Sequence, residues 1–130
     1  MNKSKLIFRI TTSILALMYL GGGSRYFLEF QEMSDIFATL QFPRWLHPLL
    51  GVTKFMAVIS LVTILFDVKA NPKWLKEWTY AAIFFNATLA LIAHQMIDEP
   101  FALSTPAIMV IVLVITSRVL WGKLNNNSKK

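Results

Sequence analysis

Four long apolar stretches dominate the sequence, at residues 6–23, 46–66, 78–97 and 101–122. A helix needs roughly 20 mainly apolar residues to cross the hydrocarbon layer of a bilayer. The charged side chains inside these stretches are Arg9, Lys54 and Arg118, and the first and third lie near a stretch end. We therefore predict an all-α, integral membrane four-helix bundle formed by one domain, residues 1–124. Residues 125–130 are predicted to be a disordered tail.

The segment between the first two stretches has a different pattern. Its apolar residues recur at helical spacing, at Phe30, Met33, Phe37 and Leu40. Acidic and amide side chains fill the positions between them. This pattern predicts an amphipathic helix within residues 25–42 that lies on the outer membrane surface or caps the bundle there.

Lysine and arginine gather on one side of the membrane if the four stretches cross it in alternation. Ten of them fall on the side of the termini, and only Arg25 and Arg44 fall on the other. Because basic residues mark cytoplasmic loops, we expect both termini in the cytoplasm. A cleaved signal peptide is the alternative for the first stretch, since Lys3 and Lys5 precede an apolar run that ends in three glycines.

Composition narrows the function classes further. Only 15% of the residues are charged, whereas a water-soluble domain carries about 25%. The net charge of +6 follows from the basic side of the membrane, so it gives no reason to expect nucleic acid. The chain has no cysteine, which excludes disulfides, thiolate metal sites and thiol redox chemistry by this chain.

Lys54 is the charged residue that most needs an explanation. It lies eight residues into its stretch, about 12 Å from the outer end of a helix. A charge in hydrocarbon costs at least about 2.5–3.5 kcal/mol, and such residues usually face the bundle interior or a water-filled cavity. One interpretation is a cationic anchor for an anionic or electron-rich ligand. The other is a structural lysine satisfied by carbonyls, water or an acidic residue of the outer segment.

The third stretch carries a stripe of small and polar side chains on one helical face. They follow at intervals of four, at Ala82, Asn86, Ala90 and His94. We expect this face to point inward and to place Asn86 and His94 within reach of Lys54. Tyr19 is a candidate hydrogen-bond donor to the same pocket. Each also has a purely structural reading, as interhelical contact for Asn86 and as a membrane-interface residue for His94 and Tyr19.

None of the four stretches contains an acidic residue. Glu29 or Glu32 of the outer segment is therefore the expected charge partner of Lys54, with Asp98 next. His47 and His94 are the candidate ligands for a haem, but a haem is not expected, because His47 stands between an interfacial tryptophan and a proline. Two histidines without an inward carboxylate are too few for a closed metal site, so no metal is expected.

The segments FPRWLHPLLGVTKFMAVISLVTI and LKEWTYAAIFFNATLALIAH resemble the DoxX-like family of small four-span membrane proteins. The resemblance rests on Pro43, Leu46, Gly51, Lys54, Glu77-Trp78, Tyr80-Ala81, Phe84-Phe85 and His94. It implies a four-helix bundle in the cytoplasmic (inner) membrane of a bacterium. Relatives in the wider group are linked to membrane oxidoreductase assemblies, including a thiosulfate-oxidising complex that passes electrons to quinone.

Three functions remain open at this point. The first is an accessory or ligand-binding subunit that holds a quinone near Lys54, Asn86 and His94 and associates with membrane oxidoreductase subunits. The second is a small transporter that works as a homo-oligomer, although proton-coupled transport would require a carboxylate within the membrane. The third is a purely structural assembly partner. The sequence shows no self-contained catalytic motif, so enzymatic activity is left undecided.

Overall fold

The computed structural model describes residues 2–67, 69–97 and 100–128, and this part of the chain is helical, with no strand. The helices are α1 (Lys3–Leu28), α2 (Phe30–Thr39), α3 (Leu46–Leu65), α4 (Lys73–Met96), the short 3-10 helix η1 (Phe101–Ser104) and α5 (Thr105–Asn127). The prediction of an all-α fold is confirmed.

Local sequence explains where the helices begin. The side chain of Asn2 accepts a hydrogen bond from the Ser4 N–H at 3.1 Å and so caps α1. Pro72 directly precedes α4, and Pro106 stands in the first turn of α5. Proline is tolerated at these positions because the N–H that it lacks has no partner within the helix.

Two expected boundaries were wrong. The outer segment was expected to begin at residue 25, but α1 continues through residues 25–28 and α2 starts two residues after it ends. Residues 125–127 were expected in a disordered tail, but α5 includes them, and neither glycine nor proline follows Gly122 to stop the helix. Residues 129–130 of the expected tail lie outside the described residues.

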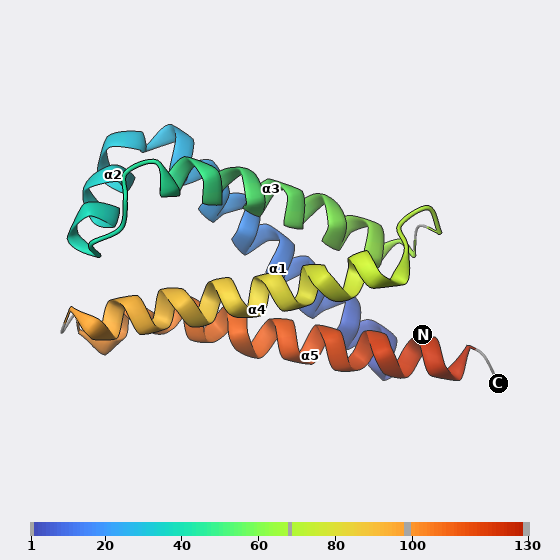
Figure 1. The fold of residues 1–130 in the computed structure, drawn as a ribbon. Helices are drawn as coiled ribbons and strands as arrows, with labels where there is room; N and C mark the ends of the chain where they lie inside the picture. The colour runs from blue at the N-terminus through green and yellow to red at the C-terminus, as the bar shows by residue number, and fades with distance from the viewer. Residues whose placement is uncertain (1, 68, 98–99, 129–130) are drawn as a thin grey trace.

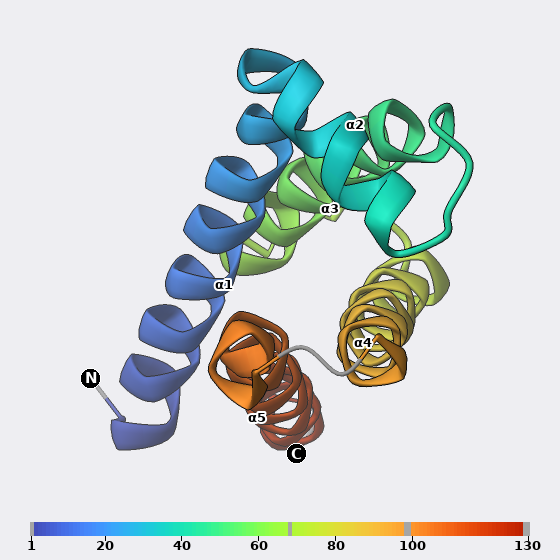
Figure 2. The same cartoon turned by 90° about the vertical axis from the view of Figure 1, so that its left-hand side faces the viewer.

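The helices form a bundle that is closed at one end and splayed at the other. α1 packs against both α3 and α5, and α4 packs mainly against α5. α3 and α4 lie close together near their connection and diverge towards the end where α2 lies (Figure 1). Viewed along the bundle, α2 lies across that splayed end (Figure 2).

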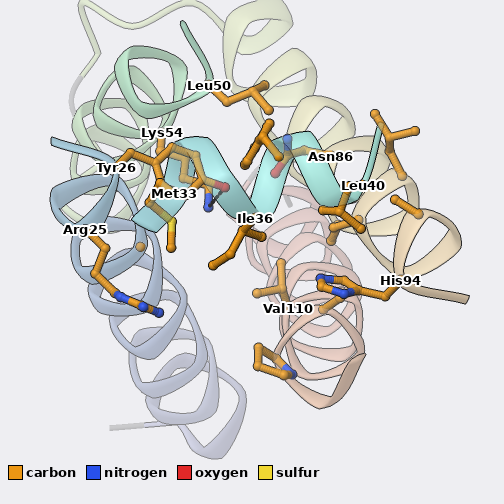
Figure 3. A pocket seen from close by; sticks show the side chains of 18 of the residues that line it. Arg25, Tyr26, Met33, Ile36, Leu40, Leu50, Lys54, Asn86, His94 and Val110 are labelled. Atoms are coloured by element: carbon orange, nitrogen blue, oxygen red, sulfur yellow. Dashed lines mark hydrogen bonds between the residues drawn. The ribbon is translucent and has the colours of Figure 1, made fainter. Parts of the chain in front are cut away.

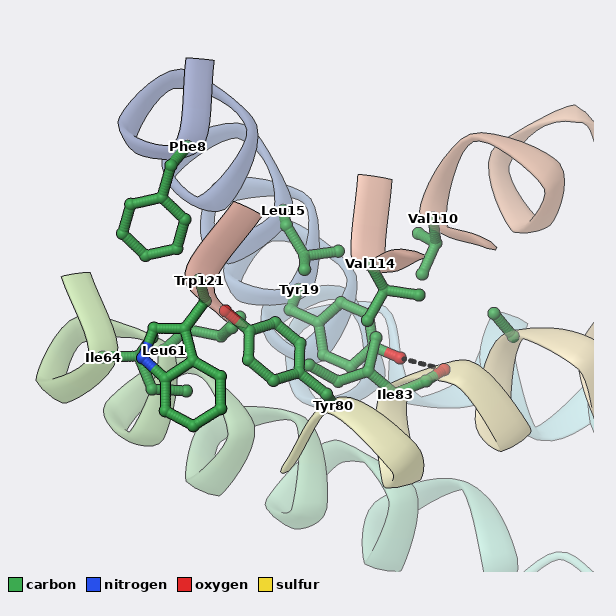
Figure 4. Close-up of a cluster of buried hydrophobic side chains, with 11 residues drawn as sticks. Phe8, Leu15, Tyr19, Leu61, Ile64, Tyr80, Ile83, Val110, Val114 and Trp121 are labelled. Carbon is green, nitrogen blue, oxygen red and sulfur yellow. Dashed lines mark hydrogen bonds between the residues drawn. The ribbon is translucent and has the colours of Figure 1, made fainter. Parts of the chain in front are cut away.

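A core of buried side chains fills the closed part of the bundle (Figure 4). Leu15 and Leu61 are fully buried in it, together with aromatic side chains from α1, α4 and α5. Thr12 and Ser117 are also fully buried, and their hydroxyl oxygens lie 2.7 Å apart. The Tyr80 hydroxyl lies 3.0 Å from the same Ser117 oxygen, so the polar atoms of this core are paired with one another.

In the described part of the chain, three helical segments are long and apolar enough to cross a membrane: Lys3–Leu28, Leu46–Leu65 and Phe101–Asn127. They correspond to the first, second and fourth predicted spans. α4 contains all but the last residue of the third predicted span but is not among them, so the count of four spans stays a prediction. Large apolar side chains are exposed along all of the long helices, as expected where lipid is the neighbour.

Candidate functional site

A cavity of about 580 Å³ lies where α3 and α4 diverge, beneath α2. Most of its wall is apolar and includes Met18, Met33, Phe37, Leu50, Leu89 and Val110. Its polar lining comes from Tyr19, Arg25, Tyr26, Lys54, Asn86 and His94. All four candidate ligand-binding residues of the sequence analysis, Tyr19, Lys54, Asn86 and His94, thus line one cavity (Figure 3).

The Lys54 ammonium is held by two tyrosines of α1. Its Nζ donates a hydrogen bond to the Tyr26 hydroxyl at 3.1 Å. The same atom lies 4.3 Å from the centroid of the Tyr26 ring and 5.6 Å from that of Tyr19. Both contacts use the negative face of an aromatic ring, which stabilises a desolvated cation. Within the described residues, Lys54 forms no ion pair with a carboxylate.

The expected charge partners of Lys54 belong to another cation. Glu29 pairs with Arg25 at 2.7 Å and Glu32 pairs with Arg25 at 3.5 Å. The longer α1 explains this difference, because it places Arg25 one helical turn before Glu29. Asp98, the other candidate partner, lies outside the described residues.

Tyr19 connects Lys54 with Asn86. The Tyr19 hydroxyl donates to Asn86 Oδ1 at 3.3 Å, while its ring lies beside the Lys54 ammonium. The Asn86 amide N–H groups have no partner within the described residues, so they remain available as donors. Figure 3 shows His94 across the cavity from Lys54. The stripe on α4 is therefore only partly inward: Asn86, Ala90 and His94 line the cavity, whereas Ala82 is exposed.

Tyr26 and Arg25 are cavity residues that the sequence analysis did not single out. Tyr26 lies seven positions after Tyr19 on one face of α1, and this spacing was a usable signal. The predicted first span ends at Gly23, so Tyr26 was not counted among the residues of that helix. His47, the second histidine weighed for haem, is fully buried among Tyr26, Phe30 and Phe37 and does not line the cavity.

Glycines give α1 and α3 the close approach that the site requires. A Cβ at Gly22 would lie 3.2 Å from Lys54 Nζ, and one at Gly23 would lie 3.3 Å from Lys54 Cβ. A Cβ at Gly51 would lie 2.7 Å from Cε2 of Phe27 and 3.1 Å from Cβ of Tyr26. The lysine stem therefore lies against a stretch of α1 backbone that carries no side chains. Small residues allow such close approach between helices in membranes.

Gly51→Val is expected to lower the free energy of unfolding by about 1–3 kcal/mol, because the new side chain overpacks the contact with α1. The measurement is unfolding of the purified protein in detergent. The matched control is Gly21→Val, since a Cβ at Gly21 meets nothing within 4 Å. If Gly51→Val and Gly21→Val have the same free energy of unfolding, the purified protein lacks the close contact between α1 and α3.

Comparison with known protein families matches residues 10–117 to the DoxX-like family. No curated protein matches the chain. No solved structure matches it either. The match covers most of the chain, including α2, α3, α4 and most of α1 and α5. This protein therefore belongs to the DoxX-like family and is a membrane protein.

Proposed function

We propose that this protein is a membrane-embedded binding subunit that holds a quinone-type molecule in the cavity beneath α2 and serves a membrane oxidoreductase. The observation that carries the proposal is the Lys54 ammonium, which lines an apolar cavity with no ion-paired carboxylate in the described chain. A partly buried cation without a countercharge favours an electron-rich ligand oxygen as its partner.

The cavity suits a ring that carries carbonyl groups. The Lys54 ammonium and the Asn86 amide are donors, and Tyr19 connects them. Carbonyl oxygens of a quinone would accept from these groups, while the ring and its tail would contact the apolar wall. The volume of about 580 Å³ lies within the range of small-molecule sites. The quinone would supply the redox chemistry, and this chain would bind and orient it.

The proposal includes four membrane spans with both termini in the cytoplasm of a bacterium. α4 has 24 residues, about 36 Å of helix, and it packs along α5, which is apolar enough to cross. The Asn86 amide and His94 lower the apolar character of α4 but line the cavity. Polar residues that face a bundle interior are compatible with a spanning helix.

The direct test replaces the cation. Lys54→Met is expected to weaken binding of a short-tail ubiquinone analogue about tenfold to a hundredfold, because a hydrogen bond to a charged group is lost. Binding is measured by titration of the purified protein in lipid nanodiscs. Lys5→Met is the control, since Lys5 is exposed near the start of α1. Equal affinity of Lys54→Met and the wild type would contradict the proposed site.

A further inference from the structure

A second, smaller cavity lies at the opposite end of the bundle, between the start of α4 and the end of α5. Its volume is about 160 Å³, and it is lined by Lys73, Lys76, Trp121, Asn125, Asn126 and Ser128. It shares no lining residue with the cavity beneath α2. The quinone proposal does not use it.

The lining of this cavity carries more positive than negative charge. The Lys76 side chain is only 7% exposed, and its Nζ lies 3.6 Å from Oδ1 of Asp67, whose own side chain is 80% exposed. Lys73 has no ion pair within the described residues. Both lysines line the cavity, but within the described residues only Lys76 has a carboxylate partner, and that carboxylate is well solvated. The site is short of negative charge around a lysine that is almost completely buried.

Neighbouring tryptophans indicate the depth of the cavity in the membrane. Trp74 and Trp78 lie on the first turns of α4, with exposed fractions of 57% and 68%. Their rings contact each other edge to face at 5.3 Å. Exposed tryptophans gather where headgroups meet the hydrocarbon layer. We therefore expect Lys73 and Lys76, which belong to the same turns, to lie at headgroup level.

We propose that this basic cavity binds a phosphate group. Lysine ammonium groups bind phosphate as point charges, and the side-chain amides of Asn125 and Asn126 add neutral donors. Basic pockets between membrane helices on the cytoplasmic side are suited to acidic lipid headgroups. The phosphate can belong to an anionic phospholipid or be free orthophosphate, and the depth of the site favours the lipid.

The test compares lipids on the full-length protein by native mass spectrometry. Phosphatidylglycerol and phosphatidylcholine are titrated separately, and orthophosphate is added as a competitor in a third arm. The wild type is expected to retain phosphatidylglycerol over phosphatidylcholine. Lys73→Gln with Lys76→Gln is expected to lower the affinity for phosphatidylglycerol about twenty-fivefold, because each of the two ammonium groups is expected to contribute about fivefold by contact with the phosphate.

Three further variants keep the test decisive. The pair Lys3→Gln and Lys5→Gln removes the same charge from exposed positions and is expected to leave binding unchanged. Asp67→Asn removes the competing carboxylate and is expected to strengthen it. Lys73→Gln alone changes an exposed residue. If loss of buried Lys76 unfolds the protein, the affinity of this single variant for phosphatidylglycerol still tests the site.

The outcomes separate the two sources of phosphate. Displacement of phosphatidylglycerol by millimolar orthophosphate supports the phosphate site and identifies free phosphate as a competing ligand. Retention of the lipid under the same competition supports the site and identifies the headgroup as the ligand. The proposal is overturned if the Lys3 and Lys5 variant loses as much affinity as the Lys73 and Lys76 variant. It is also overturned if the wild type binds phosphatidylglycerol no more tightly than phosphatidylcholine and orthophosphate displaces neither lipid.

Discussion

Replacing Ala90 with tryptophan is expected to abolish binding of a short-tail ubiquinone analogue, with a loss of affinity of at least about a hundredfold, equivalent to roughly 2.7 kcal/mol. Ala90 lines the cavity beneath α2 on the same face of α4 as Asn86 and His94. An indole ring at this position would occupy the space proposed for the ligand ring. The lysine, the tyrosines and the asparagine would all remain, so the loss would report on space rather than on charge.

Phe85→Trp is the matched control for this prediction. Phe85 lies on the same helix, is 68% exposed and does not line the cavity. Its replacement adds a similar ring on the outside of α4. Titration in nanodiscs should give wild-type affinity for Phe85→Trp and none for Ala90→Trp. Wild-type affinity in both variants would place the ligand outside this cavity, whatever the effect of Lys54→Met.

Leu61→Ala is expected to lower the free energy of unfolding by about 2–5 kcal/mol. Leu61 is fully buried in the core at the closed part of the bundle, where Leu15 and Ile64 also lie. Lipid is as apolar as leucine, so the expected cost arises mainly from packing contacts that are lost around the new void.

The control for the core is Ile59→Ala, because Ile59 is 66% exposed on the same helix. Denaturant unfolding of both variants in mixed micelles gives the comparison. A small difference between them would mean that α3 is not packed against α1 and α4 as described. Quinone binding by folded Leu61→Ala should stay close to that of the wild type, since Leu61 does not line the cavity.

The helices were predictable because apolar length and helical spacing are local properties of the sequence. The amphipathic pattern of residues 30–40 predicted α2, and Met33 and Phe37 are buried as that pattern required. The end of α1 was not predictable in the same way. Glycines usually mark helix ends, but Gly21, Gly22 and Gly23 lie inside α1. Tertiary contact with Lys54 and Gly51 favours Gly22 and Gly23 there over residues with better helix propensity.

The candidate site was partly predictable from the cost of burying polar groups. Lys54 stood out because a charge inside an apolar stretch requires a partner, and Asn86 and His94 stood out by their spacing. Long-range geometry could not be deduced. The contact of Lys54 with Tyr26 depends on the crossing of α1 with α3, and the pairing of Arg25 with Glu29 and Glu32 depends on how far α1 continues. Neither the length of α1 nor its crossing with α3 can be deduced from the sequence of one segment alone.

Because α3 and α4 diverge, the proposed ligand site and the buried leucines lie in different parts of the bundle. The fully buried leucines lie in the closed part of the bundle, whereas the cavity opens at the splayed end beneath α2. We therefore expect exchange of the proposed ligand to disturb α2, a ten-residue helix, more than the buried leucines. Substitutions at cavity residues outside the core are then expected to change how long that ligand stays bound, while substitutions of the buried leucines change thermal stability.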